Sequence, residues 1–299
     1  MESPDLFAKL NEGLLNERLG AFRRNIEKNL PLIKTYGGLS NVVAQLKGRH
    51  IFIAGAGPSI EESIPFLKKY QSRDEIAIIS ADMALKVLLK HGIKPGYVIS
   101  CETSPALFFA GAKTAGIRLL AFSCISPTNL RSWKGEVSFF NWMMHGEPFD
   151  KLWERAGLDL GFVATASIVT TQAVSIALGC SPASIVLIGN DMGFKDRYYA
   201  AETEPCFKDY VNSERLKTLA TLEMGRVRRA REYEIRRGPK IFYTNNQFLA
   251  AKNWLEQLFK EHSCLIYDCS MPGCSESSVI KTNVKKILQE LERKPKRRS

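Results

Sequence analysis

The chain has 299 residues, of which 45% are hydrophobic, and it carries a formal net charge of +11 with a pI near 9.3. This composition is that of a globular protein and predicts one large domain, or one domain with an appendage, rather than a disordered chain. The excess of basic side chains predicts an acidic partner, which leaves a nucleotide, an anionic sugar, an acidic protein surface and nucleic acid as candidates.

Charged residues interrupt the first 29 positions, so no signal peptide is visible and we expect a cytoplasmic protein. The longest uncharged stretch, Leu160–Asn190, contains hydroxyl side chains and a break at Gly179–Pro182, and predicts a buried helix followed by a buried strand instead of a membrane span. The seven cysteines are expected to be reduced. They form no C-x-x-C pair, so a zinc site is not predicted.

Residues 1–47 show apolar side chains at helical spacing and predict a helical N-terminal segment that leads into a sheet. Residues 48–194 then alternate strand and helix patterns, which predicts a nucleotide-binding α/β domain with a doubly wound, mostly parallel, Rossmann-like sheet. The expected strands are 50–54, 76–80, 97–101, 118–124, 137–141 and 184–189, and the expected helices are 59–70, 83–91 and 165–178.

Residues 195–292 predict a helical lid and a C-terminal segment that completes the domain, with a helix at 245–259 and a strand at 264–267. The polar stretch 195–238 is expected to be helical, and its arginines, from Arg226 to Arg237, either cover an anionic substrate or form a solvated helix face. The basic tail 293–299 is expected to be disordered.

A glycine turn follows the first expected strand, in the run Gly55-Ala56-Gly57-Pro58-Ser59. Such a turn before a helix leaves backbone N–H groups that can bind a phosphate, and glycine permits positive φ and close approach of the ligand. Pro58 suits a first helical turn, and Ser59 can cap it. The third glycine of the dinucleotide fingerprint is replaced by Ile60, so a plain structural turn is the other interpretation.

Polar side chains follow three expected strands, where doubly wound sheets bind their ligands. Asp82 follows the second strand, Glu102 the third, and Asn190 with Asp191 the strand at 184–189. We therefore expect Asp82, Glu102 and Asp191 to converge on one cleft. Each of these carboxylates can also be a helix cap or a solvated loop residue, and Asp82 in particular can start the helix that follows it.

Five motifs follow one another along the chain. They are Gly55-Ala56-Gly57-Pro58-Ser59-Ile60, Ser80-Ala81-Asp82-Met83-Ala84-Leu85, His91-Gly92-Ile93-Lys94-Pro95-Gly96-Tyr97-Val98-Ile99-Ser100, Ala164-Thr165-Ala166-Ser167-Ile168-Val169 and Leu187-Ile188-Gly189-Asn190-Asp191-Met192-Gly193-Phe194. Their order resembles that of the motility-associated-factor (Maf) glycosyltransferases, and the same domain is similar to the archaeal 6-hydroxymethylpterin diphosphokinases. The resemblance covers roughly residues 48–200.

The resemblance to Maf proteins implies transfer of a nonulosonic, sialic-like acid from its cytidine monophosphate (CMP) form to Ser or Thr hydroxyls of flagellin in the cytoplasm. It implies that the turn residues Gly55, Gly57, Pro58 and Ser59 bind phosphate, and that Ser80 and Asp82 bind the ribose or the base. Thr165 and Ser167 would bind the sugar carboxylate or the phosphate, and Asn190 and Asp191 would close the pocket.

The acceptor hydroxyl needs a base, and His145, in a loop after an expected strand, is the candidate among four histidines, with Glu102 and Asp191 as catalytic carboxylates. A surface histidine is the other interpretation of His145. The chain departs from the Maf pattern in having Glu102 where Asp is common. It also lacks a histidine in the run Lys195-Asp196-Arg197-Tyr198-Tyr199.

Two further functions stay open. A diphosphokinase would move pyrophosphate from ATP to a hydroxymethylated pterin, with Mg²⁺ bound by Asp82 and Asp191. A non-catalytic nucleotide or nucleic-acid binding module would use the arginines between 226 and 237, although this segment lacks the interleaved aromatic platform expected for binding single strands, which makes nucleic acid the weaker partner.

Overall fold

The computed structural model describes residues 3–166, 168–200, 203, 218–275 and 277–293. Within these residues the strands are β1 (His50–Ala54), β2 (Ile76–Ala81), β3 (Tyr97–Ser100), β4 (Arg118–Phe122), β5 (Val137–Trp142), β6 (Phe162–Val163), β7 (Ser184–Ile188), β8 (Tyr233–Arg237), β9 (Lys240–Thr244), β10 (Ile266–Asp268) and β11 (Val279–Lys281). The helices are α1 (Ser3–Tyr36), α2 (Ser40–Leu46), α3 (Ile60–Tyr70), α4 (Asp82–Lys90), α5 (Pro127–Arg131), α6 (Phe149–Ala156), η1 (Leu158–Leu160), α7 (Val169–Gly179), α9 (Leu219–Ala230), α10 (Asn246–Glu261) and α11 (Val284–Arg293).

The described strands form a nine-stranded sheet in the order β11-β10-β7-β1-β2-β3-β4-β5-β6 and a separate β8-β9 hairpin. Each neighbouring pair in the large sheet is parallel. The chain runs from β1 outward to β6 and then returns to the other side of β1 with β7. The gap between β1 and β7 is therefore the point where strand order reverses, which is where open α/β sheets bind their ligands.

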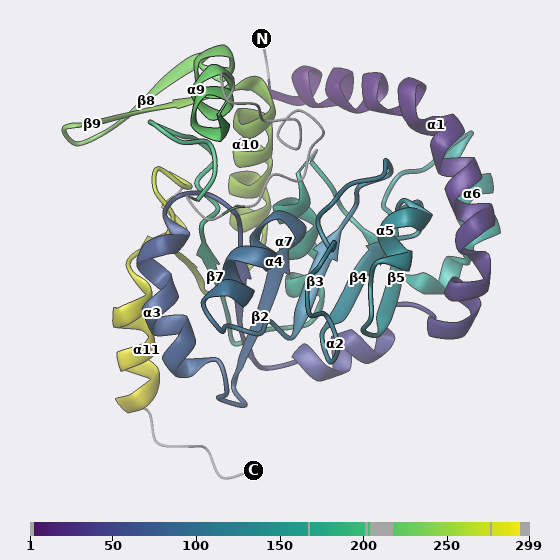
Figure 1. Cartoon of the computed structure of the whole chain (residues 1–299), viewed down its shortest axis with the longest axis horizontal. Coiled ribbons are helices and arrows are strands. Elements are labelled where there is room, and N and C mark those ends of the chain that lie inside the picture. The colour runs from purple at the N-terminus through teal and green to yellow at the C-terminus, as the bar shows by residue number, and fades with distance from the viewer. Residues whose placement is uncertain (1–2, 167, 201–202, 204–217, 276, 294–299) are drawn as a thin grey trace.

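Side chains of the central strands alternate between two apolar layers. In β1, Ile51 and Ile53 face the layer that contains α1, α7 and α10, whereas Phe52 and Ala54 face the layer that contains α3, α4 and α11. Because successive side chains of a strand point to opposite faces, this alternation places helices on both sides of the sheet, as Figure 1 shows. The predicted doubly wound α/β fold is confirmed.

The long helix α1 lies across the carboxyl end of the sheet near β4 and β5 (Figure 1). Its Asn25 Nδ2 donates to the carbonyl oxygens of Thr103 and Cys124, each at 2.9 Å. One turn later, Asn29 Nδ2 donates to Ser123 at 3.0 Å and to Ile125 at 2.8 Å. Two buried amides thus attach α1 to the loops that follow β3 and β4, so α1 is part of the ligand-binding edge and not only a lead-in.

Two parts of the chain beyond residue 194 differ from the expected pattern. The stretch expected to be helical up to residue 238 contains α9 and then a strand, because residues 233–237 pair with 240–244 in the β8-β9 hairpin. The strand predicted at 264–267 is present as β10, which pairs with β7, whereas β11 was not predicted and pairs with β10 at the edge of the large sheet. The proposed domain boundaries stay a prediction. The tail expected to be disordered, 293–299, begins with Arg293, which instead is the last residue of α11, and residues 294–299 lie outside the described part.

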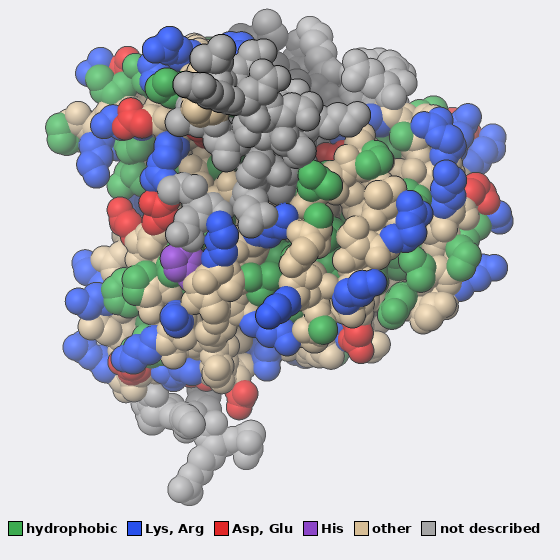
Figure 2. All heavy atoms as spheres, in the orientation of Figure 1, with side chains coloured by type: hydrophobic (Ala, Val, Ile, Leu, Met, Phe, Trp, Pro, Cys, Tyr) green, Lys and Arg blue, Asp and Glu red, His purple; other side chains and the backbone are tan. Residues whose placement is uncertain are grey.

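The basic character of the chain is spread over its surface. Figure 2 shows Lys and Arg side chains over most of the visible face, including the side occupied by α1 and the side occupied by the hairpin. Among the described residues, the helices contain no apolar stretch long enough to cross a bilayer.

Substitution of Asn29 tests how α1 is attached. Asn29→Ala leaves two buried carbonyl oxygens without donors, so we expect the free energy of unfolding to fall by about 1–3 kcal/mol. Urea unfolding monitored by circular dichroism measures the change. Lys28→Ala, an exposed substitution on the same helix, is the control. Equal stability of the two variants would contradict the attachment.

Candidate active site at the carboxyl edge of the sheet

A cavity of about 320 Å³ opens at the carboxyl ends of the strands. Residues that directly follow β1, β2, β3 and β7 line it, together with Trp142, the last residue of β5. The cavity therefore begins at the β1/β7 reversal point and extends along the edge of the sheet to β5.

The three carboxylates expected to converge, Asp82, Glu102 and Asp191, all line this cavity. Their convergence, predicted from their positions after separate strands, is confirmed. Their roles have to be considered separately, because the three carboxylates differ in hydrogen-bond partners and in burial.

The expectation that the glycine turn offers free amides is wrong for most of the turn. The Gly57 N–H donates to the Gly189 carbonyl at 2.8 Å, and the Ser59 N–H donates to Asp191 Oδ2 at 3.0 Å. The Ile60 N–H donates to the Gly57 carbonyl at 3.1 Å. Gly55, Ala56 and Gly57 line the cavity, but the protein's own carbonyl and carboxylate groups occupy the amides that a phosphate would need.

The glycines serve packing between two loops. A Cβ on Gly57 would lie 2.5 Å from Asp191 Oδ2 and 2.8 Å from the Gly189 carbonyl oxygen, and one on Gly55 would collide with the Gly189 carbonyl. Neither Gly55 nor Gly57 has a positive φ. Pro58 lies in the turn before α3, and the Ser59 hydroxyl donates to Asp191 instead of capping the helix. The turn is closely approached, as predicted, but the group that approaches it is the loop after β7 and not a ligand.

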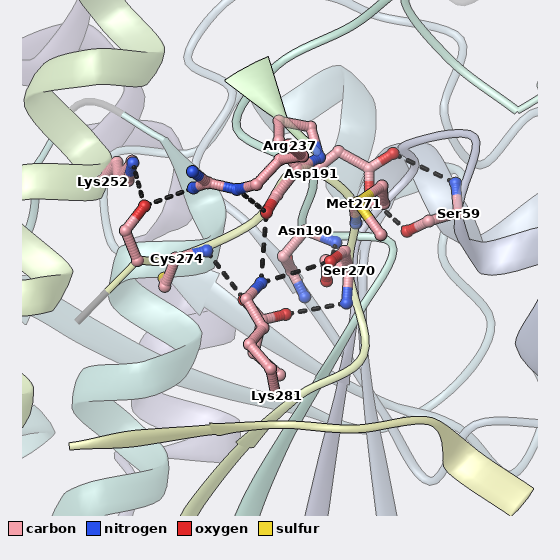
Figure 3. A network of polar contacts seen from close by, with 12 residues as sticks. Ser59, Asn190, Asp191, Arg237, Lys252, Ser270, Met271, Cys274 and Lys281 are labelled. Carbon is pink, nitrogen blue, oxygen red and sulfur yellow. Dashed lines mark hydrogen bonds and ion pairs between the residues drawn. The ribbon is translucent and has the colours of Figure 1, made fainter. Parts of the chain in front are cut away.

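Asp191 is the centre of this loop packing (Figure 3). Its buried carboxylate accepts from the Ser59 amide and hydroxyl and, at 3.3 Å, from the Met271 amide, while its carbonyl accepts from the Gly273 amide at 2.8 Å. Burial raises the pKa of the Asp191 carboxyl to about 7, against the opposite effect of these donors. Asp191 thus connects the β1 turn to the loop after β10.

Asn190 also has a structural role. Its Nδ2 donates to the Ile53 carbonyl at 2.7 Å, and its Oδ1 accepts from the Thr170 hydroxyl at 2.7 Å. Its backbone N–H donates to the Ser270 hydroxyl at 2.9 Å. The side chain lines the cavity while its polar atoms connect β1, β7 and α7.

Asp82 starts the helix that follows it, as one interpretation predicted, and it also lines the cavity, while its binding role stays a prediction. It is the first residue of α4, and its Oδ1 accepts from the Met83 N–H at 2.8 Å. Its Oδ2 accepts from the Ser100 hydroxyl at 2.6 Å. Burial raises the pKa of the Asp82 carboxyl to about 6, and the nearby Glu102 charge contributes to the shift. Ser80 is fully buried and donates to the Ala81 carbonyl, so it does not reach the cavity.

Glu102 is close enough to Asp82 for its charge to affect that carboxyl, and it is more exposed to solvent than Asp82. Its Oε1 accepts from the Ser104 N–H at 2.8 Å. Thr165 lines the cavity ahead of α7, which begins at Val169 without a side-chain cap, and Ile168, Val169 and Thr170 line the cavity as well. Ser167 lies outside the described residues. Among the described contacts, the start of α7 has no side-chain cap, whereas Asp191 occupies the Ser59 amide at the start of α3.

The structure does not bring His145 to the cavity. His145 is exposed, with its ring centroid 6.2 Å from that of Phe162. The cavity wall contains no histidine in the described part of the chain. The strand end that precedes His145 does contribute, through Trp142 and Met144.

Several cavity residues were not predicted from the sequence, and Arg18 is the most informative of them. Arg226 belongs to the arginine run that was predicted either to cover an anionic substrate or to form a solvated helix face. Arg18 comes from α1, and Arg226 comes from α9, where its guanidinium lies 4.5 Å from the ring centroid of Tyr198 and donates to the Tyr199 hydroxyl at 3.1 Å. Arg228 and Arg229 on the same helix are exposed. The arginine-rich segment thus gives one residue to the cavity and others to solvent.

The described residues contain no group of three His, Cys, Asp or Glu side chains arranged for a metal ion. Mg²⁺ in phosphate-transfer sites needs only one or two carboxylates together with substrate phosphates. The neighbouring pair Asp82 and Glu102 fits that requirement. Asp191 does not, because three protein donors already occupy its oxygens.

The parallel sheet, the reversal point between β1 and β7 and the carboxylate-lined cavity define a Rossmann-like α/β protein with a candidate ligand site at the carboxyl edge of the sheet. Residues 24–197 match the sequence model of the family described as 6-hydroxymethylpterin diphosphokinase MptE-like. The chain belongs to this family.

Among solved structures, the fold is similar to that of the Maf glycosyltransferase from Magnetospirillum magneticum AMB-1, with a TM-score of 0.52 and 17% sequence identity. The match covers 82% of this chain and 37% of the Maf chain, so this protein spans little more than a third of that structure's length. No curated protein matches the chain.

Substitution of Gly57 tests the loop packing. Gly57→Ala places a methyl group against the Asp191 carboxylate and the Gly189 carbonyl, so we expect a loss of about 1–3 kcal/mol in the free energy of unfolding. Gly96→Ala is the control, because a Cβ there meets no atom within 4 Å. Chemical denaturation of both variants measures the difference. A Gly57→Ala protein as stable as Gly96→Ala would contradict this packing.

The raised pKa of Asp191 predicts a pH dependence of stability. The folded state keeps the proton of Asp191 up to about pH 7, whereas the unfolded state releases it near pH 4. The stabilisation of the folded state that comes from this proton is therefore fully present below about pH 4 and is lost as the pH rises through 7. Asp191→Asn removes this titration. We expect its free energy of unfolding to fall less than that of the wild type between about pH 4 and 8. Parallel pH profiles would refute the assignment.

Proposed function

We propose that the protein is a glycosyltransferase that moves an acidic, nonulosonic sugar from its CMP-activated form to a hydroxyl group. The observation that carries the proposal is the small number of phosphate-binding groups at the cavity. The described cavity wall offers the uncapped N-terminus of α7 and the side chains of Arg18 and Arg226, and it contains no lysine. This set suits a donor with one phosphate and one carboxylate better than it suits a triphosphate.

The extent of the cavity supports a substrate of nucleotide-sugar size. The loops that line it follow strands from β7 to β5, which are five strand spacings apart in the sheet. At about 4.8 Å per spacing, the edge is roughly 24 Å long. A nucleotide, its sugar and an acceptor hydroxyl can bind end to end along an edge of this length.

The phosphate is placed at the start of α7, where backbone N–H groups and the helix dipole favour a negative charge. Thr165 and Thr170 border this position. In this arrangement Gly55 and Gly57 form the floor of the phosphate position, and Asp191 keeps that floor in place. The binding roles expected for Ser59 and Asn190 become structural ones.

Glu102 is the proposed base. It lines the cavity and is more exposed than Asp82, and among the described contacts only its Oε1 accepts a hydrogen bond. In the transfer, Glu102 takes the proton of the acceptor hydroxyl while that oxygen forms a bond to the anomeric carbon. The bond from this carbon to the phosphate oxygen breaks, and CMP leaves with the electron pair.

The nature of the acceptor rests on the resemblance to Maf proteins. It supports a protein hydroxyl, such as a Ser or Thr of flagellin, as the acceptor, and the cytoplasm as the compartment. Arg228 and Arg229 are exposed on α9, the helix that also carries Arg226 of the cavity, so an acidic protein surface can bind them.

The alternative is a diphosphokinase, which the description of the matched family favours. In that reaction Asp82 and Glu102 would hold Mg²⁺, and the ion would neutralise charge on the phosphates of ATP. Arg18 and Arg226 would bind the remaining phosphate oxygens. A non-catalytic nucleotide-binding module would keep the cavity but would have no need for the accessible Glu102.

A thermal-shift titration separates these functions. We expect CMP, without Mg²⁺, to raise the melting temperature by several degrees at a concentration of about 100 times its Kd, where binding adds about 2.7 kcal/mol. ATP and 6-hydroxymethylpterin, each with and without Mg²⁺, are the comparison ligands. Stabilisation by ATP that depends on Mg²⁺, with no effect of CMP, would replace the glycosyltransferase proposal by the diphosphokinase. The variant Glu102→Gln should bind CMP like the wild type and lose transfer activity.

A further inference from the structure

A cluster of aromatic side chains reaches the cavity from the segment after β7 and from α10. The ring centroids of Phe194 and Tyr198 lie 4.9 Å apart with an angle of 31° between the rings, and those of Tyr198 and Phe248 lie 5.3 Å apart at 30°. The exposed fraction rises along this series, from 1% for Phe194 and 7% for Tyr198 to the half-buried Phe248. Phe248, which lines the cavity, is therefore the most accessible of the three rings.

Tyr199 is a second half-buried aromatic residue in the cavity wall. Its ring meets that of Tyr198 edge to face, with the centroids 5.0 Å apart. Arg226 donates to the Tyr199 hydroxyl at 3.1 Å. The next residue, Ala200, donates its N–H to the carbonyl of Ala56 in the glycine turn at 2.9 Å. The tyrosine segment is therefore held against the floor of the cavity at the reversal point between β1 and β7.

The two ends of the cavity differ in the groups that line them. After β2 and β3 the wall carries the carboxylates of Asp82 and Glu102, which suit the hydroxyl groups of a ribose or another sugar. At the β7 end, Phe248 and Tyr199 line the wall together with Gln247, whose amide can pair with donors and acceptors at the edge of a ring. Aromatic side chains next to such an amide suit a flat heteroaromatic group, because one π face stacks on another.

The position of these rings agrees with the phosphate position proposed above. Thr170, at the start of α7, donates to the side chain of Asn190 directly after β7 at 2.7 Å. The aromatic wall and the start of α7 therefore lie at the same end of the cavity. Glu102 follows β3, which is two strands beyond β1 in the sheet. A nucleotide bound at the β7 end can extend its sugar toward Glu102.

We propose that Phe248 and Tyr199 form a stacking site for the planar heteroaromatic ring of the ligand at the β7 end of the cavity. Phe248 packs on Tyr198, and the hydroxyl of Tyr199 is bonded to Arg226, so both rings are held in place before a ligand binds. Such preorganisation reduces the entropy that binding costs. Under the proposed function, on which the identity of the ring rests, the ring is the cytosine of CMP. Adenine and pterin rings stack in the same way, so the experiment must distinguish these sources.

The experiment is calorimetric titration of the full chain with four probes: CMP, ribose 5-phosphate, ATP with Mg²⁺, and 6-hydroxymethylpterin. Ribose 5-phosphate carries the sugar and the phosphate of a nucleotide but no ring. Phe248→Leu and Tyr199→Leu remove the aromatic face and keep an apolar side chain, whereas Phe248→Tyr and Tyr199→Phe retain it. The control is Tyr36→Leu, because Tyr36 is exposed and does not line the cavity. Circular dichroism verifies that each variant is folded.

We expect CMP to bind the wild type about 10- to 100-fold more tightly than ribose 5-phosphate, the effect of stacking one base. Phe248→Leu and Tyr199→Leu should each weaken CMP binding by about 3- to 10-fold, because the aromatic contact is lost while part of the apolar contact remains. Both should bind ribose 5-phosphate like the wild type. Phe248→Tyr, Tyr199→Phe and the control Tyr36→Leu should bind CMP like the wild type.

The outcomes separate the stacking site from the proposed function. If ATP or the pterin, and not CMP, binds in a way that depends on the two rings, the site is supported and the CMP donor is refuted. If CMP binds but Phe248→Leu and Tyr199→Leu behave like Tyr36→Leu, the site is refuted while the CMP donor stands. An equal loss of CMP and ribose 5-phosphate binding in these variants would also refute the site, as would a wild type that binds no ring compound.

Discussion

The geometry of the cavity floor depends on one buried carboxylate. Asp191 accepts hydrogen bonds from the start of α3 and from the loop after β10, and so connects three strands that are neighbours at the reversal point of the sheet. That loop is itself fixed by Asp268, whose buried carboxylate accepts from the Ser270 and Cys274 amides and from Lys281 (Figure 3). The Asp191 carboxyl group therefore accepts hydrogen bonds at the start of α3, where a bound anion accepts them in other glycine turns.

This arrangement changes what the glycine turn contributes. In a phosphate loop, glycines allow the backbone to approach a ligand, and the amides stay free for it. Here Gly55 and Gly57 allow two loops of the protein to approach each other, and the amides are used for that contact. The anion-binding capacity moves to the uncapped start of α7 and to the arginines of the flanking helices. The cavity lies where this fold binds its ligands, but its cationic side chains come from α1 and α9 and not from the glycine turn.

The flanking segments supply what the shared part of the family does not. The matched residues 24–197 contain Asp82, Glu102 and Asp191, while Arg18 and Arg226 come from before and after them. Arg226 is positioned by stacking on Tyr198 and by its hydrogen bond to Tyr199, and Arg18 by α1, which Asn25 and Asn29 attach to the loops after β3 and β4.

The sheet could be predicted from the amino-acid pattern, because the alternation of apolar strands and amphipathic helices has few physical solutions, and the same pattern predicted which strand ends carry carboxylates. Which polar groups have protein partners depends on contacts between distant parts of the chain. Whether the Ser59 amide faces a ligand or Asp191 depends on a contact across 132 positions of the chain, and local patterns carry no information about it. The same holds for Arg18, which reaches the cavity only because α1 packs across β5, and for His145, which the loop after β5 turns toward solvent.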